Sequence, residues 1–320
     1  MSKPKLMRDV FVDTLYQAGK KDRDLFLLSA DFGAAALDSF REDLPGQFIH
    51  MGISEQNMVD VGAGLALSGK KVFLYAMAPF ITARCYEQVK SVIASMKLPI
   101  TLIGVGVGLG YNHATLTHFA PEDIACMKAL NGIEVLSPSD HVSAGQLAQL
   151  SVEKPAFRYI RLERQPQTVI YEENDYSTIQ QGYSVLSEGT DICLVACGYF
   201  THKILKARDL LKDKGINAGV VDLFRIKPLN KAGLMKVFEK YPAVLTAEEQ
   251  LLEGGFGSTI AELLSDKQSK IALKRLGIQD GFKVVNGERD ELHRLYNIDT
   301  GDIVENAELI VKKVLQNHSH

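Results

Sequence analysis

Short apolar runs alternate with segments of helical periodicity along this chain, and the alternation restricts the possible folds more than any other feature. The runs 25–31, 71–77 and 98–106 are bounded by glycine, proline or charged residues, which is typical of buried strands. The segments 55–69 and 83–96 repeat apolar residues at helical spacing. This order predicts β-α units stacked around a largely parallel sheet.

A second β-α series follows a polar, turn-rich stretch. Before that stretch, the strand predicted at 133–140 leads into a helix capped by Ser139 or Asp140, and a further strand is expected at 156–164. Beyond it we expect strands at 191–198, 216–223 and 243–250, with helices at 202–215 and 254–266. The chain should therefore form two three-layer α/β domains, residues 1–175 and 191–320, with a linker or short hairpin at 176–190.

Composition describes an ordinary globular protein. The 320 residues are 46% hydrophobic, the net charge is −3, and no run of Lys or Arg suggests a nucleic-acid surface. There is no apolar stretch of membrane-spanning length and no secretory pattern at the N-terminus, so we expect a cytoplasmic protein that does not bind membranes. The four cysteines lie in apolar segments without a CxxC pair and are expected to be reduced core residues.

The segment GISEQNMVDVGAGLALSG at 52–69 carries the first chemical signal. Ser54 is suited to cap the helix, which places Glu55 in the first turn, where the helix dipole favours a carboxylate. Gly62 and Gly64 allow close packing against a neighbouring element. From the residues alone, a capped and tightly packed helix explains this pattern, and a functional role for Glu55 is the alternative.

This segment resembles the pyrimidine-domain signature of transketolases, deoxyxylulose phosphate synthases and the β subunits of 2-oxo acid dehydrogenases. The resemblance implies thiamine diphosphate as cofactor, with Glu55 hydrogen-bonded to a ring nitrogen of its aminopyrimidine and so favouring the tautomer that activates it. It also implies that Ile53 contacts the cofactor, as does Phe80 in YAMAPFITARCYEQVK, which would stack on the aminopyrimidine. A purely structural Phe80 in the core is the alternative.

The stretch GVGVGLGYNHATLTHFAPEDIACMKAL at 104–130 resembles a flexible segment of the same families. Aligning the shared EDIA places His118 on the active-site histidine of that segment. Tyr111-Asn112-His113 replaces the usual Glu-Asp-Gly, and two residues are extra. We therefore expect His118, with His113, to be catalytic and Asn112 to contact substrate; solvent-exposed, idle histidines are the alternative.

Three arginines extend the resemblance to the substrate. Arg8 in LMRDVF and Arg164 in LERQP match arginines that contact the sugar phosphate in transketolases, and Arg84 resembles one found near substrate in deoxyxylulose phosphate synthases. The family's serine is absent near Ala35, and Gly104 replaces its histidine. A phosphorylated or otherwise anionic sugar is thus expected.

The second half resembles the C-terminal domain of these families, which implies a smaller domain with a mixed sheet. The glycines of EGGFG at 253–257 fit a tight turn at a helix start better than a nucleotide loop. The families' diphosphate-binding Gly-Asp-Gly is not in the chain, and we find no metal ligands. We therefore expect an N-terminal partner subunit to hold the diphosphate and a Mg²⁺ or Ca²⁺ ion, in an α2β2 assembly.

Three functions stay open at this point. The first is the C-terminal subunit of a two-chain transketolase, which moves a two-carbon ketol unit from a ketose to an aldehyde. The second is a 2-oxo acid dehydrogenase β subunit or a deoxyxylulose phosphate synthase-like enzyme. The third is a non-catalytic structural subunit, against which the presence of Glu55 argues.

Overall fold

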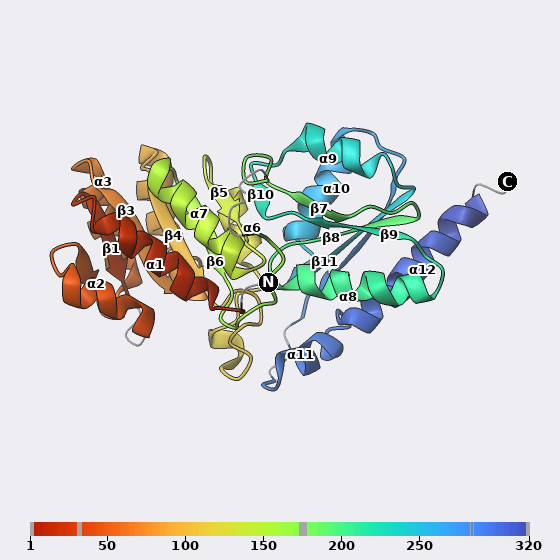
Figure 1. Ribbon diagram of the computed structural model, residues 1–320, viewed down its shortest axis with the longest axis horizontal. Helices are drawn as coiled ribbons and strands as arrows, with labels where there is room; N and C mark the ends of the chain where they lie inside the picture. Colours follow the sequence, from red (N-terminus) through yellow and green to blue (C-terminus); the bar gives the residue numbers. More distant parts are fainter. Residues whose placement is uncertain (1–2, 31–33, 173–177, 282, 284, 318–320) are drawn as a thin grey trace.

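Two β-sheets, each covered by helices on both faces, lie side by side in the computed structural model of the chain (Figure 1). The structure describes residues 3–30, 34–172, 178–281, 283 and 285–317. These two three-layer halves confirm the predicted fold class.

The first sheet is parallel apart from one edge strand. Its strands are, in spatial order, β10 (Arg225–Lys227), β5 (Glu134–Leu136), β6 (Arg158–Leu162), β4 (Ile100–Val105), β3 (Lys71–Met77), β1 (Leu25–Ser29) and β2 (Phe48–His50). Its helices are α1 (Met7–Gly19), α2 (Asp38–Asp43), α3 (Glu55–Leu67), α4 (Ala78–Ile81), α5 (Tyr86–Gln88), the π-helical η2 (Val89–Ala94), α6 (Asp123–Ala129) and α7 (His141–Glu153), with 3-10 turns η1 (Ala35–Leu37) and η3 (Thr115–Thr117).

Alternate residues of the central strands explain the layers. Phe73 and Tyr75 of β3 belong to the apolar cluster that includes α1 and α7. Leu74, between them, belongs to the cluster that includes α3. Because successive side chains of a strand point to opposite faces, an apolar run such as KVFLYAM has to be covered on both sides.

The second sheet is mixed, as expected. Its strands are β12 (Ala272–Ile278), β11 (Ala243–Leu251), β8 (Ile192–Ala196), β9 (Ala218–Asp222) and β7 (Ser184–Ser187), with β7 antiparallel to β9. Its helices are α8 (Tyr199–Asp213), α9 (Lys231–Phe238), α10 (Phe256–Asp266), α11 (Arg289–Leu295) and α12 (Thr300–Asn317). The stretch predicted as a linker at 176–190 therefore contains β7, an edge strand of this sheet.

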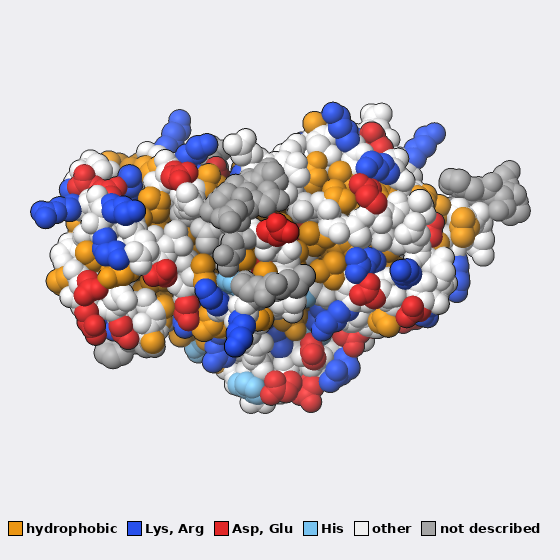
Figure 2. Space-filling model, viewed as in Figure 1, with side chains coloured by type: hydrophobic (Ala, Val, Ile, Leu, Met, Phe, Trp, Pro, Cys, Tyr) orange, Lys and Arg blue, Asp and Glu red, His pale blue; other side chains and the backbone are white. Residues whose placement is uncertain are grey.

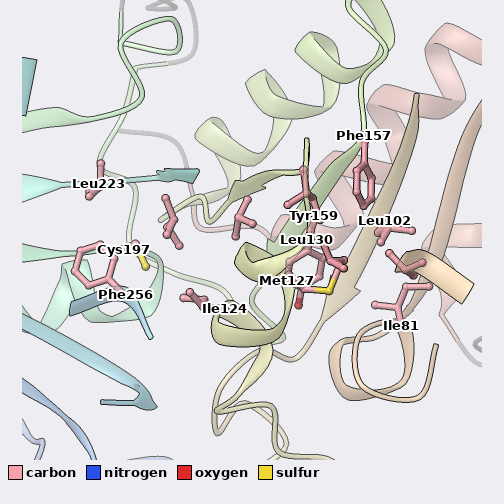
Figure 3. Close-up of a cluster of buried hydrophobic side chains, with 14 of the residues drawn as sticks. Ile81, Leu102, Ile124, Met127, Leu130, Phe157, Tyr159, Cys197, Leu223 and Phe256 are labelled. Carbon is pink, nitrogen blue, oxygen red and sulfur yellow. The ribbon is translucent and has the colours of Figure 1, made fainter. Parts of the chain in front are cut away.

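The two halves share one core. Strand β10, which follows β9 in the chain, adds antiparallel to β5 at the edge of the first sheet. Figure 3 shows Ile124 and Met127 of α6 in the same apolar cluster as Leu223 and Phe256 from the second half. This continuous burial holds the end of the first sheet against the second domain.

Two helix starts are fixed by buried carboxylates. Asp140 caps α7, as predicted, by accepting a hydrogen bond from the backbone N–H of Ser143 at 2.7 Å. The glycine turn before α10 is a helix start rather than a nucleotide loop, because Glu248 accepts hydrogen bonds from the N–H groups of Phe256 and Gly257, both at 2.6 Å. An internal carboxylate thus takes the place where a helix would bind an anion.

The cysteines are free thiols. Cys85, Cys193 and Cys197 are buried, as expected, whereas Cys126 is only half-buried, so its assignment to the core was wrong in that respect. Burial raises the pKa of the Cys85 and Cys197 thiols to about 12. None of the helices that the structure describes is long and apolar enough to span a membrane.

Candidate active site

The predicted site residues gather beyond the carboxyl ends of neighbouring strands in the first sheet. Glu55 follows β2, Phe80 and Arg84 follow β3, His118 follows β4, and Arg164 follows β6. These strands are parallel and adjacent or nearly so, since the order is β6-β4-β3-β1-β2. Open α/β sheets bind ligands along such an edge, so the topology places these side chains where a site is expected.

Glu55 begins α3 and is 3% exposed. The predicted side-chain cap by Ser54 is wrong, because the Ser54 hydroxyl donates to the carbonyl of Met51 at 2.6 Å instead of accepting from a helix N–H. This bond folds the turn back on itself, and Gly52 supplies the positive φ of +67° that the turn requires. The turn leaves Ile53 exposed beside the buried carboxylate.

Arg84 connects Glu55 to Phe80. One guanidinium nitrogen of Arg84 donates to a carboxylate oxygen of Glu55 at 2.7 Å. The guanidinium carbon also lies 3.9 Å from the centroid of the Phe80 ring. The space between the carboxylate and the ring therefore accepts a planar group that donates hydrogen bonds.

Further ring contacts link Phe80 to residues that we expect to bind substrate. The His118 ring meets Phe80 edge to face, with centroids 5.3 Å apart, and lies 5.7 Å from Tyr111. The guanidinium of Arg164 lies 4.8 Å from the Tyr111 ring. His118 Nδ1 contacts the Thr117 hydroxyl at 2.8 Å. The structure thus brings Glu55, Phe80, Arg84, His118 and Arg164 into one row, with Tyr111 as a member that the sequence reading did not assign.

Three other candidates lie outside this row. Asn112 is buried and donates to the carbonyl of Gly287 at 2.6 Å. His113 Nε2 lies 3.4 Å from a carboxylate oxygen of Glu288. Arg8 pairs with the neighbouring Asp9 at 2.8 Å. The second domain is therefore in direct contact with the loop that carries both histidines.

A buried ion cluster joins the end of β6 to the second domain, and sequence reasoning missed it. Arg289 bonds to Glu163, the residue before Arg164, and to Glu249 of β11. Burial acts against ionisation of Glu249, but Arg289 and His293 outweigh it and hold the pKa of this carboxyl at about 2. Burial raises the pKa of Glu163, and Arg289 opposes part of that rise. The only local sequence signal for this cluster was the charged Glu163 directly after the buried strand β6.

The aspartate of the EDIA motif, Asp123, has a structural role. Asp123 is fully buried and accepts hydrogen bonds from the Tyr159 hydroxyl and the Arg161 guanidinium, both at 2.8 Å. These bonds fix the start of α6 and the end of the histidine loop relative to β6. Among the residues that the structure describes, no group of three His, Cys, Asp or Glu side chains could hold a metal ion.

Comparisons with known proteins show which family the chain belongs to. Residues 3–168 match the model of the transketolase pyrimidine binding domain, and residues 182–303 match that of the transketolase C-terminal domain. The chain belongs to the transketolase family. It carries the pyrimidine-binding and C-terminal domains of that family, which implies dependence on thiamine diphosphate.

Several relatives of this transketolase-family chain are named as single subunits of transketolases. One subunit of the apulose-4-phosphate transketolase of Phocaeicola vulgatus is 34% identical, over 96% of this chain and 97% of the relative. The 6-deoxy-6-sulfo-D-fructose transketolase subunit SqwH of a Clostridium species is 32% identical, over 96% and 95%. A solved split-gene transketolase, described as an inactive beta4 tetramer, superposes with a TM-score of 0.86 at 30% identity, covering 97% of this chain and 99% of that one.

The side chains in the row fit the aminopyrimidine of that cofactor. Arg84 shows that a flat, hydrogen-bond-donating group can lie on Phe80 and reach the Glu55 carboxylate at the same time. A protonated aminopyrimidine has this same combination of a flat ring and a donor. Glu55 and Phe80 would hold it, with the exposed Ile53 at its border.

Proposed function

We propose that this chain is the catalytic C-terminal subunit of a two-chain transketolase that transfers a ketol unit from an anionic ketose to an aldehyde. The observation that carries the proposal is the buried Glu55 carboxylate next to the Phe80 ring, in a chain of the transketolase family. Ketol transfer is supported for the family as a whole, and the substrates named for two relatives are both anionic sugars.

Each side chain of the row has a distinct role in this proposal. Glu55 shares a proton with the pyrimidine ring nitrogen, and its burial keeps water away from that proton. Phe80 supports the ring from one face. Thiamine diphosphate, when bound, supplies the carbon nucleophile and carries the transferred unit.

Substrate contacts come from the other end of the row. His118 has its Nδ1 engaged by Thr117, which leaves Nε2 to exchange protons with sugar hydroxyls. Arg164, lying over Tyr111, would bind the anionic end of the sugar, and its planar fork suits a phosphate or sulfonate. His113, Asn112, Arg8 and Arg84 complete the proposed substrate set.

A partner subunit completes the enzyme. We assign the diphosphate and a Mg²⁺ or Ca²⁺ ion to an N-terminal transketolase subunit, with an α2β2 assembly. Two similar proteins are named as single subunits of transketolases, and a similar chain alone forms an inactive tetramer; both observations support this division. Tight binding of thiamine diphosphate and Mg²⁺ by this chain alone, with ketose turnover, would overturn it.

The decisive experiment replaces Glu55 in the reconstituted pair. Glu55→Gln should lower kcat by about 10²–10⁴-fold, the usual contribution of a positioned proton-transfer group, while the cofactor still binds. Asp60→Asn, an exposed acid on the same helix, is the matched control and should leave kcat unchanged. An unchanged rate in Glu55→Gln would instead favour a structural subunit.

The two other enzyme classes predict different donors. A 2-oxo acid dehydrogenase β subunit would turn over pyruvate only with a lipoyl acceptor, and a deoxyxylulose phosphate synthase-like enzyme would use pyruvate with an aldehyde phosphate. A panel of pyruvate, plain ketoses, ketose phosphates and sulfonated ketoses separates these cases. Turnover with pyruvate and none with any ketose would reverse our assignment.

A further inference from the structure

One short segment of the second domain, Gly287–Arg289, contacts the histidine loop of the first domain. The Asn112 amide is 2% exposed and donates to the Gly287 carbonyl at 2.6 Å. The side chains of the following residues, His113 and Glu288, lie beside each other at the surface, 62% and 73% exposed, with His113 Nε2 3.4 Å from Glu288 Oε1. Figure 1 shows this loop beside the start of α11, and Figure 2 shows a histidine among acidic and basic side chains at that edge of the molecule.

The loop also lies against Glu249 of the second domain, and its backbone is strained. A Cβ on Gly108 would lie against the carboxylate of Glu249, closer than van der Waals contact allows. Thr115, between the two histidines, has a φ of +62°, a strained conformation for a β-branched residue. Such strain persists only where surrounding contacts impose it, and the second domain supplies several of these contacts.

Arg289 ties the same segment to the other side of the site. Its guanidinium bonds to both oxygens of Glu163, at 2.7 and 3.1 Å, and its Nε donates to Glu249 at 3.0 Å. All three side chains are less than 5% exposed. Glu163 adjoins Arg164, so Arg289 constrains the backbone that presents Arg164 to Tyr111.

The geometry points to Gly287–Arg289 as a specificity-determining wall of the substrate site. In this wall Arg289 is a positioning residue for Arg164 and for the loop 108–119, and Glu288 lies against His113. The inference rests on the proposed function, since it names what shapes the sugar site. The replaced residues Asn112 and His113, and Glu163 directly before Arg164, all contact this segment.

The first experiment does not require turnover. Arg289→Lys keeps the buried positive charge but removes the guanidinium fork, so Glu163 and Glu249 are not left uncompensated. Arg158→Lys is the matched control, because Arg158 is also buried and paired with a glutamate, Glu134, at the opposite end of β6. Hydrogen exchange of the full chain should be about tenfold faster across residues 108–119 in Arg289→Lys than in Arg158→Lys. Equal exchange in the two variants would overturn the inference.

The second experiment measures specificity in the reconstituted pair. Arg289→Lys should raise the donor KM about tenfold with kcat changed less than about twofold, and change the ranking of donors that differ in hydroxyls or in the anionic group. Glu305→Gln, an exposed acid on α12, should change neither constant. Equal losses of kcat for every donor would indicate general destabilisation and overturn a role in specificity.

Two safeguards keep the outcomes separate. If Arg289→Lys does not fold, Glu163→Gln removes the same link with Arg289 still paired to Glu249, and the same exchange difference is expected. If the wild-type pair turns over no ketose, the proposed function fails, while the exchange experiment still decides whether this segment shapes the loop.

Discussion

Arg84 donates a hydrogen bond of 2.7 Å to the buried carboxylate of Glu55 while its guanidinium lies over the ring of Phe80. These are the two side chains that we propose for holding the aminopyrimidine. The guanidinium and the pyrimidine cannot occupy the same space. In our proposal Arg84, which is 40% exposed, therefore moves when the cofactor binds.

Removal of Arg84 should strengthen cofactor binding. In Arg84→Ala, Glu55 and Phe80 no longer have an internal competitor, so the apparent Kd for thiamine diphosphate should fall by about three- to tenfold. Fluorescence titration of the reconstituted pair measures this, with Arg208→Ala, a partly exposed arginine of α8 paired with Asp209, as control. Weaker binding in Arg84→Ala would show that Arg84 holds the cofactor instead of yielding to it.

Two glycines of α3 should respond in opposite ways to alanine. A Cβ on Gly62 would lie 2.8 Å from a methyl carbon of Leu74 in β3, whereas a Cβ on Gly64 would meet nothing within 4 Å. Gly64→Ala should stabilise the chain by about 0.5–1 kcal/mol through helix propensity. Gly62→Ala should destabilise it by about 1–3 kcal/mol through overpacking. The urea unfolding midpoints of the two variants measure these changes. Equal effects on stability would contradict the packing described for α3.

Asp222 should make the chain less stable as pH rises. Burial raises the pKa of this carboxyl to about 7, against an ordinary value of 3.8. A raised pKa in the folded state contributes stability that is complete below pH 3.8 and is lost as pH rises through about 7. Asp222→Asn does not titrate, so the wild-type advantage in free energy of unfolding should shrink by about 1 kcal/mol or more between pH 5 and 8. A constant difference across that range would show that Asp222 is ionised throughout.

Loss of the Asp140 carboxylate should cost more than loss of an ordinary helix cap. Besides capping α7, Asp140 accepts hydrogen bonds from the backbone N–H groups of Ile170 at 2.7 Å and Tyr171 at 2.9 Å. Asp140→Ala leaves three backbone donors, one buried and two partly buried, without this acceptor and should cost about 2–4 kcal/mol. Asn230→Ala, which removes the cap of α9 and a 3.2 Å hydrogen bond to the Gln181 carbonyl, should cost about 1 kcal/mol by thermal or urea unfolding. Similar losses would mean that water replaces Asp140 at residues 170 and 171.

The strands and helices could be predicted from the sequence because their signals are local. Strand β3 occupies 71–77, as the apolar run indicated, and α3 begins at Glu55, directly after the expected cap position. The parallel order of strands then places Glu55, Phe80, His118 and Arg164 along one edge. That Phe80 and His118 lie against each other follows from the loop conformation, which periodicity does not describe.

The partners of the charged side chains could not be predicted in this way. The sequence by itself determined the two α/β domains, the buried glutamate at a helix start and the family, since these depend on neighbouring residues. Only the tertiary structure decided that Arg84 pairs with the Glu55 carboxylate and that β10 joins the first sheet. It also decided that Arg289 bonds to Glu163, 126 residues away. A buried charge pairs with whichever opposite charge the packed layers bring within about 3 Å, and that depends on the three-dimensional arrangement of the layers rather than on spacing along the chain.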